Sequence, residues 1–81
     1  NFEHANTKNL FMMFDMFESE AKSLVEKKLS LPSYDQCLKA SHVFNILDAR
    51  GAISVAQRAE YISRIREITK SAASIWIDTQ I

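Results

Sequence analysis

The scarcity of chain-breaking residues constrains this sequence more than any other feature. Its 81 residues include one glycine and one proline. Because these residues mark most turns, a chain with so few of them can form only a few long elements, which indicates helices. With 47% apolar and 25% charged residues, the composition is that of an ordinary globular protein. The length allows one small domain with one core over residues 1–81.

The first helix is predicted over residues 7–29. Asn6 or Thr7 can accept the first free backbone amides as its N-cap. Met12 and Met16 fall on the far side of this helix at about 100° per residue. They are either isolated apolar surface residues or a contact patch for another domain. The core-facing stripe recurs at steps of three and four residues and comprises Leu10, Met13, Phe14, Phe17, Ala21, Leu24 and Val25.

The second helix is predicted over residues 32–50. Pro32 suits the first turn of a helix, where its missing N–H is not needed, and Gly51 suits the left-handed conformation that ends one. Apolar residues, Phe44 among them, cover well over half of the circumference of this helix. We therefore expect it to contact both neighbours and a protein surface outside this domain. Phe44 joins the two methionines of the first helix as a candidate apolar interface.

The third helix is predicted over residues 55–79. It begins with a capping box, in which Ser54 and Gln57 can satisfy each other's backbone amides. Long helices joined by short connections pack as antiparallel neighbours. We therefore predict an all-α fold, an antiparallel three-helix bundle with long helices. The apolar stripe of the third helix comprises Tyr61, Ile62, Ile65, Ile68, Ala72, Ile75 and Trp76.

Four polar residues around the second turn form a candidate functional site. Asn45 and Asp48 lie on one side of the second helix, and Arg58 lies on the apolar stripe of the third, within reach of Asp48. One interpretation is a structural ion pair, because an unpaired buried charge is costly. The other is that Asn45, Asp48, Arg50 and Arg58 form a polar edge that contacts a partner. The two interpretations are compatible.

Two further arginines, Arg64 and Arg66, flank the apolar stripe of the third helix, one at each edge. Arginines in such positions usually lay their stems over the core and keep their heads in water. The alternative is contact with phosphate, whose oxygens match the guanidinium fork.

The residues that catalysis requires are missing from the sequence. His4 and His42 are far apart, and Cys37 lies five residues from His42, a spacing that does not stack on one helix face. We therefore predict no metal site. One glycine cannot form a phosphate-binding loop, and no serine or cysteine has a base at a recognisable spacing. We predict no catalytic residue and no cofactor within these 81 residues.

Charge and hydropathy limit the partners and the location. Ten basic and ten acidic residues cancel, so any nucleic-acid contact must be local or shared with a partner. The lone Cys37 excludes an internal disulfide and suits a reducing compartment. No apolar run approaches the roughly 18 residues of a membrane span, and no signal peptide precedes the first helix. These features together favour a cytoplasmic location. Because the chain opens with Asn1 rather than Met, we expect it to be a piece of a longer protein.

One long stretch resembles a known family. Residues 34–55, YDQCLKASHVFNILDARGAISV, are similar to the C-terminal part of the α subunit of tetrameric bacterial glycyl-tRNA synthetase. Arg58 and residues 61–66, YISRIR, fit the same family. Residues 1–3, NFE, resemble the point where the catalytic domain of that subunit gives way to its helical tail. The similarity covers essentially all 81 residues, and LDARxAISV is a long, specific string.

This resemblance implies a class II synthetase. Its α subunit activates glycine with ATP and magnesium and transfers it to the terminal adenosine of tRNA, and a β subunit assists tRNA recognition in an α2β2 tetramer. The ATP- and glycine-binding motifs of the family lie upstream, so no catalytic residue is carried over. The helical tail would pack on the catalytic domain of the same α chain, where it could seat the tRNA acceptor stem or dock the β subunit. The candidates for tRNA or subunit contact are Asn45, Asp48, Arg50, Arg58 and Arg64.

Two functional interpretations from different classes stay open. The first is an accessory domain of glycine–tRNA ligase that supports charging through packing, acceptor-stem contact or β-subunit docking. The second is a purely structural protein–protein interaction module without RNA contact. A helical DNA-binding fold is a third interpretation, which the long helices and the zero net charge disfavour.

Overall fold

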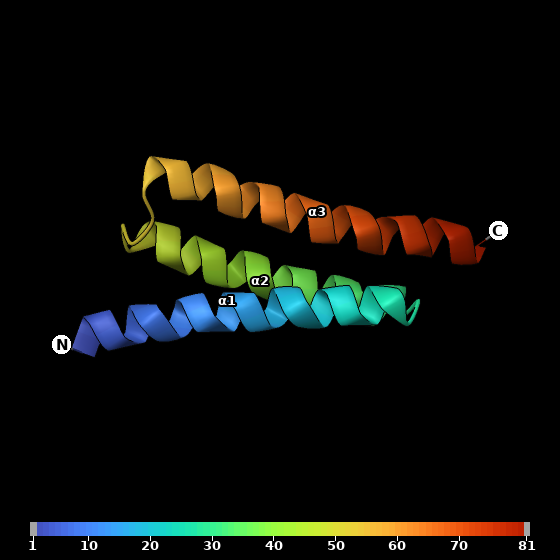
Figure 1. Ribbon diagram of the computed structural model, residues 1–81, viewed down its shortest axis with the longest axis horizontal. Coiled ribbons are helices and arrows are strands. Elements are labelled where there is room, and N and C mark those ends of the chain that lie inside the picture. The colour runs from blue at the N-terminus through green and yellow to red at the C-terminus, as the bar shows by residue number, and fades with distance from the viewer. Residues whose placement is uncertain (1, 81) are drawn as a thin grey trace.

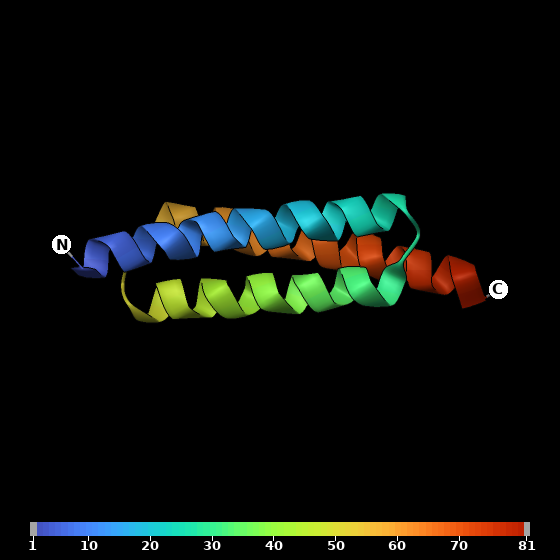
Figure 2. The same cartoon turned by 90° about the horizontal axis from the view of Figure 1, so that it is seen from below.

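Three long antiparallel helices pack against one another (Figure 1). The computed structural model describes the backbone of residues 2–80 and the side chains of residues 6–79. Its helices are α1 (Phe2–Glu26), α2 (Ser30–Ala49) and α3 (Val55–Gln80), and residues 2–80 contain no strand. The predicted all-α three-helix bundle is therefore confirmed. Figure 2 shows that α3 extends past the turn between α1 and α2, so its last turns have fewer neighbours than its middle.

The predicted helix starts are partly wrong. α1 begins at Phe2, so Asn6 and Thr7 lie inside the helix and are not its N-cap. No helix breaker separates these residues from Phe2, and the helix continues through them. α2 begins at Ser30, two residues before the predicted start, and Pro32 lies in its first turn, where the missing N–H leaves no bond unmade. The other ends lie within three residues of the predicted positions.

Both turns close with the same backbone motif. Lys28 after α1 has a φ of 59°, and Gly51 after α2 has a φ of 69°. Each left-handed residue ends its helix in a Schellman motif. The left-handed conformation of Gly51 at the second turn agrees with the prediction. At the first turn Lys28 adopts it, which the sequence did not predict. In each motif one N–H donates to the carbonyl five residues earlier. Leu29 donates to Leu24 at 2.9 Å after α1, and Ala52 donates to Leu47 at 3.1 Å after α2.

The start of α3 confirms the predicted capping box. The N–H of Ser54 donates to Oε1 of Gln57 at 2.9 Å, and the N–H of Gln57 donates to Oγ of Ser54 at 3.1 Å. The two side chains thus satisfy amides that the first turn of a helix leaves without partners.

The core lies between all three helices, and small residues let the helices approach closely. Ser33 is fully buried, and its Oγ donates to the Ala21 carbonyl of α1 at 2.9 Å. Ser30 similarly donates to the Ala72 carbonyl of α3 at 2.8 Å. These bonds satisfy the hydroxyls that packing removes from water. The buried apolar residues are Leu10, Phe14, Ala21, Cys37, Ala40, Val43, Phe44, Leu47, Ile68 and Ala72.

Three side chains differ from the sequence prediction in their burial. Phe44 is only 6% exposed and stacks near Tyr61, so it belongs to the core and is not an interface residue. Trp76 is 44% exposed at the end of α3, where it lines an open hollow beside the first turns of α2. Met13 was assigned to the core stripe but is exposed at the edge of the α1–α2 contact.

Candidate functional site

Arg64 of α3 binds α1 through ion pairs and a cation–π contact. Its Nε and Nη2 donate to the two carboxylate oxygens of Glu18 at 2.9 and 2.6 Å, and Nη2 also donates to Asp15 at 2.8 Å. The guanidinium carbon lies 4.8 Å from the ring centroid of Phe14 and 4.9 Å from that of Tyr61. The head of Arg64 is therefore held by α1, and its predicted position in water is wrong.

This network shifts the ionisation of its members. Hydrogen bonding to Arg64 lowers the pKa of Glu18, against the opposing effect of burial. The hydrogen bond to Glu18 likewise raises the pKa of Arg64 above its ordinary value, and burial raises the pKa of Tyr61. Both members of the Arg64–Glu18 pair thus stay charged at neutral pH. Because Arg64 would have to break these bonds to reach a phosphate, we interpret it as a structural residue.

The polar corner consists of Asn45, Asp48, Arg50 and Arg58, at the connection between α2 and α3. Nη2 of Arg58 lies 3.3 Å from Oδ2 of Asp48, which confirms the predicted ion pair. The pair lies at the surface, however, with the Arg58 side chain more than half exposed. Asn45 and Arg50 are exposed as well. All four side chains are accessible to a partner, and their contact with tRNA or a subunit stays a prediction.

The α1–α2 apolar surface consists of Met12, Met13, Met16, Phe17 and Leu38. It includes all three methionines of the chain, and Met16 is 65% exposed. A hollow of about 420 Å³ between α1 and α2 is lined by Met13, Phe17 and Leu38, whereas Met12 and Met16 lie further around α1. Exposed apolar surface with a groove is typical of protein-interaction sites, and methionine adapts readily to the shape of a partner. The predicted exposure of Met12 and Met16 is confirmed.

A second hollow, which the sequence did not predict, lies between the start of α2 and the end of α3. It measures about 210 Å³ and lies between Leu31 and Tyr34 of α2 and Ala73 and Trp76 of α3. Tyr34 and Trp76 are each 44% exposed. The apolar character of α2 on most of its sides was a signal for Tyr34. For Trp76 no local signal exists, because its exposure depends on where the neighbouring helices end.

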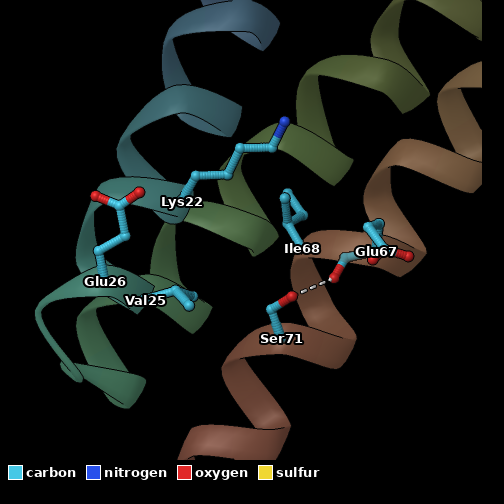
Figure 3. Close-up of a pocket in the computed structure, with 6 residues that line it drawn as sticks. All are labelled: Lys22, Val25, Glu26, Glu67, Ile68 and Ser71. Atoms are coloured by element: carbon cyan, nitrogen blue, oxygen red, sulfur yellow. Dashed lines mark hydrogen bonds between the residues drawn. The ribbon is translucent and has the colours of Figure 1, made fainter.

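A third hollow, of about 250 Å³, lies between α1 and α3 (Figure 3). The carboxylates of Glu26 and Glu67 lie on opposite sides of it, and Lys22 reaches over it from α1. Oγ of Ser71 donates to the Glu67 carbonyl at 3.0 Å, a bond within α3. Val25 and Ile68 form the apolar part of the lining. The hollow is open and of mixed polarity.

The candidate metal ligands of the described part of the chain lie apart from one another. Among residues 6–79, no three His, Cys, Asp or Glu side chains lie close enough to hold a metal ion. The side chain of His4 lies outside the described residues. Cys37 is 2% exposed, and burial raises the pKa of its thiol. Within Phe2–Gln80, no helix has the length and hydropathy that a membrane crossing requires.

A comparison with family models agrees with the resemblance found in the sequence. A model described as "Glycyl-tRNA synthetase alpha subunit" matches residues 1–81. This description supports a role in the ligase that attaches glycine to tRNA, and the word subunit implies assembly with other chains. The chain, which folds into a bundle of three long helices, belongs to the glycyl-tRNA synthetase alpha subunit family.

Proposed function

We propose that this bundle is an accessory domain of glycine–tRNA ligase that holds another protein surface on its α1–α2 apolar surface. The observation that carries the proposal is the open apolar groove lined by Met13, Phe17 and Leu38, with the exposed Met12 and Met16 further around α1. Each large apolar side chain left in water forgoes a stabilisation of about 1.5–3 kcal/mol that a partner could provide. A docking role explains why these side chains are exposed in a chain whose core is otherwise well packed.

The partner in this proposal is either the catalytic domain of the same α chain or the β subunit of an α2β2 enzyme. Activation of glycine with ATP and magnesium would occur in the class II catalytic domain. This bundle would contribute by fixing the arrangement of that domain and the β subunit. The family match supports the ligase and the assembly of subunits.

The experiment is to assemble the complete synthetase with Met16→Glu or Leu38→Glu in this domain. Both residues lie on the α1–α2 apolar surface and are more than half exposed, so the bundle itself should stay folded. We expect loss of the β subunit from the purified complex, or loss of charging activity if the catalytic domain is the partner. The matched control is Val55→Glu, which places the same charge at an apolar side chain 89% exposed in the first turn of α3.

Retention of both the complex and full activity in Met16→Glu and Leu38→Glu would refute the docking role. Circular dichroism of each variant separates loss of docking from loss of folding. Phe44 is unsuitable for this test, because its replacement would damage the core.

The polar corner supports a second candidate function, contact with the phosphates of tRNA. Arg50 and Arg58 are exposed there, and Arg58 pairs with Asp48 at 3.3 Å. Arg50→Ala in the complete synthetase should then weaken tRNA binding and reduce its salt dependence by about one ion. An unchanged salt slope would remove this candidate and leave the purely structural alternative.

A further inference from the structure

The outer face of α2 has no neighbour among the described helices. In Figure 2, α2 forms one side of the bundle, and neither α1 nor α3 covers that face. Leu31, Tyr34 and Leu38 share this face at about 100° per residue, and they are 63%, 44% and 53% exposed. Large apolar side chains that gather on one exposed face mark an interaction site, whereas single ones do not.

One ridge of α2 connects two hollows of the surface. Tyr34, Leu38 and His42 follow one another at steps of four residues, so their side chains form a continuous ridge along the helix. Tyr34 lines the hollow of about 210 Å³ beside α3, whereas Leu38 and His42 line the hollow of about 420 Å³ beside α1. The ridge therefore passes from one hollow to the other.

The walls opposite the ridge are apolar as well. α1 contributes Met13 and Phe17 to the larger hollow, and α3 contributes Ala73 and Trp76 to the smaller one. The exposed apolar surface thus runs obliquely over α2, from α1 on one flank to α3 on the other. It is broader than the α1–α2 apolar surface alone, because it includes the smaller hollow.

The charges beside the ridge offer little to an ionic partner. Lys39 lines the larger hollow, and its Nζ lies 3.5 Å from Oδ2 of Asp35, one turn earlier on α2. Among the described residues, no carboxylate lines either hollow. A matching partner is therefore apolar at its centre, because Lys39 already has a partner and an unpaired charge is costly to bury.

We propose that a helix of another subunit of the synthetase crosses the outer face of α2 along this ridge and places an apolar side chain in each hollow. Ridges of side chains four residues apart pack into the grooves of a second helix at about 50°, the commonest class of helix packing. The oblique path between the two hollows fits such a crossing. The occupant is assigned to another chain, because the family description names a subunit. This inference rests on the proposed docking role and specifies its occupant.

The length of the ridge defines the pattern of the partner helix. Tyr34 and His42 are eight residues apart, about 12 Å along α2. A helix that follows the ridge reaches both hollows with apolar side chains about seven or eight residues apart, and the turn between them covers Leu38. Such a spacing places both side chains on one face, which is the usual form of an amphipathic helix in an apolar groove.

The test uses the complete synthetase with a photoreactive phenylalanine analogue in place of Tyr34 or His42, which are both exposed. We expect both positions to cross-link to one helix of another subunit, at sites about seven or eight residues apart. The matched control is the analogue at Val55, an exposed position in the first turn of α3, which should not cross-link to that helix. Cross-links to two separate segments, to the same chain or to no protein would overturn the proposal.

Substitutions separate this proposal from the docking role on which it rests. Leu31→Glu and Trp76→Glu at the smaller hollow should weaken the same association as Leu38→Glu at the larger one, each by about tenfold or more, because each buries an unpaired charge. The control is Ile77→Glu, at an exposed apolar position about 100° around α3 from Trp76, which should leave the association unchanged. If only Leu38→Glu releases the subunit, the docking role holds and the crossing helix is wrong. If none of the three releases it, both are wrong.

Discussion

Arg64 should be the most important polar residue for the stability of this bundle. In Arg64→Ala, Glu18 loses both of its hydrogen bonds from the guanidinium group, and two rings lose the cation above them. Hydrogen bonds to charged groups contribute about 1.5–3 kcal/mol, and a partly desolvated cation–π contact about 1 kcal/mol. The bond to Asp15 adds little, because that carboxylate is largely exposed.

We therefore expect Arg64→Ala to lower the free energy of unfolding by about 3 kcal/mol. A domain of this size derives only about 3–5 kcal/mol from its core, so the loss should bring it close to unfolding. Urea denaturation followed by circular dichroism measures the change. Glu18→Gln and the double variant complete a cycle that isolates the coupling of the two residues. Arg58→Ala is the matched control, and it should cost less than about 1 kcal/mol because its ion pair is at the surface.

The pH dependence gives an independent test of the same pair. Hydrogen bonding to Arg64 lowers the pKa of Glu18 in the folded chain below its ordinary value of 4.5. A lowered folded pKa means that the contribution is complete above the unfolded pKa and is lost as the pH falls through the folded pKa. The wild-type chain should therefore lose stability as the pH falls below about 4.5, and Arg64→Ala should lose less. If Arg64→Ala lowers the free energy of unfolding by less than about 0.5 kcal/mol at neutral pH, the stabilising role of this pair is refuted.

Three further predictions concern the core and the turns. Phe44→Ala should cost about 3–5 kcal/mol and abolish cooperative thermal unfolding by circular dichroism, because the ring is buried; a folded variant would support the original interface assignment. Gly51→Ala should cost about 1–2 kcal/mol in urea denaturation, from backbone conformation alone, since no atom lies within 4 Å of the added Cβ. Cys37 should react with a thiol reagent far more slowly in the native chain than in urea, because burial shields it and raises its pKa; equal rates would contradict the packing.

Local signals predicted the features that depend on a few neighbouring residues. Ser54 and Gln57 form the expected capping box, and Gly51 adopts the expected left-handed conformation. Both effects involve hydrogen bonds or dihedral angles within one turn, so the sequence contains all the information they need. Lys28 shows the limit of this approach, because a lysine adopts the left-handed conformation only where the surrounding structure requires it.

The candidate site was predictable only in part. The Asp48–Arg58 pair follows from helix spacing across a short turn, and the exposure of Met12 and Met16 follows from the period of α1. Phe44 was assigned to the wrong surface, because a helix that is apolar on most sides gives no indication of which side its neighbours cover.

Composition, helical period and capping residues together determined that this chain forms three long antiparallel helices, and its motifs indicated the synthetase family. The tertiary structure decided which charges meet across helices, as Arg64 does with Glu18, and which apolar side chains stay exposed, as Trp76 does. The physical reason is that helix formation depends on residues three or four positions apart, whereas burial and ion pairing between helices depend on their lengths, offsets and relative rotation.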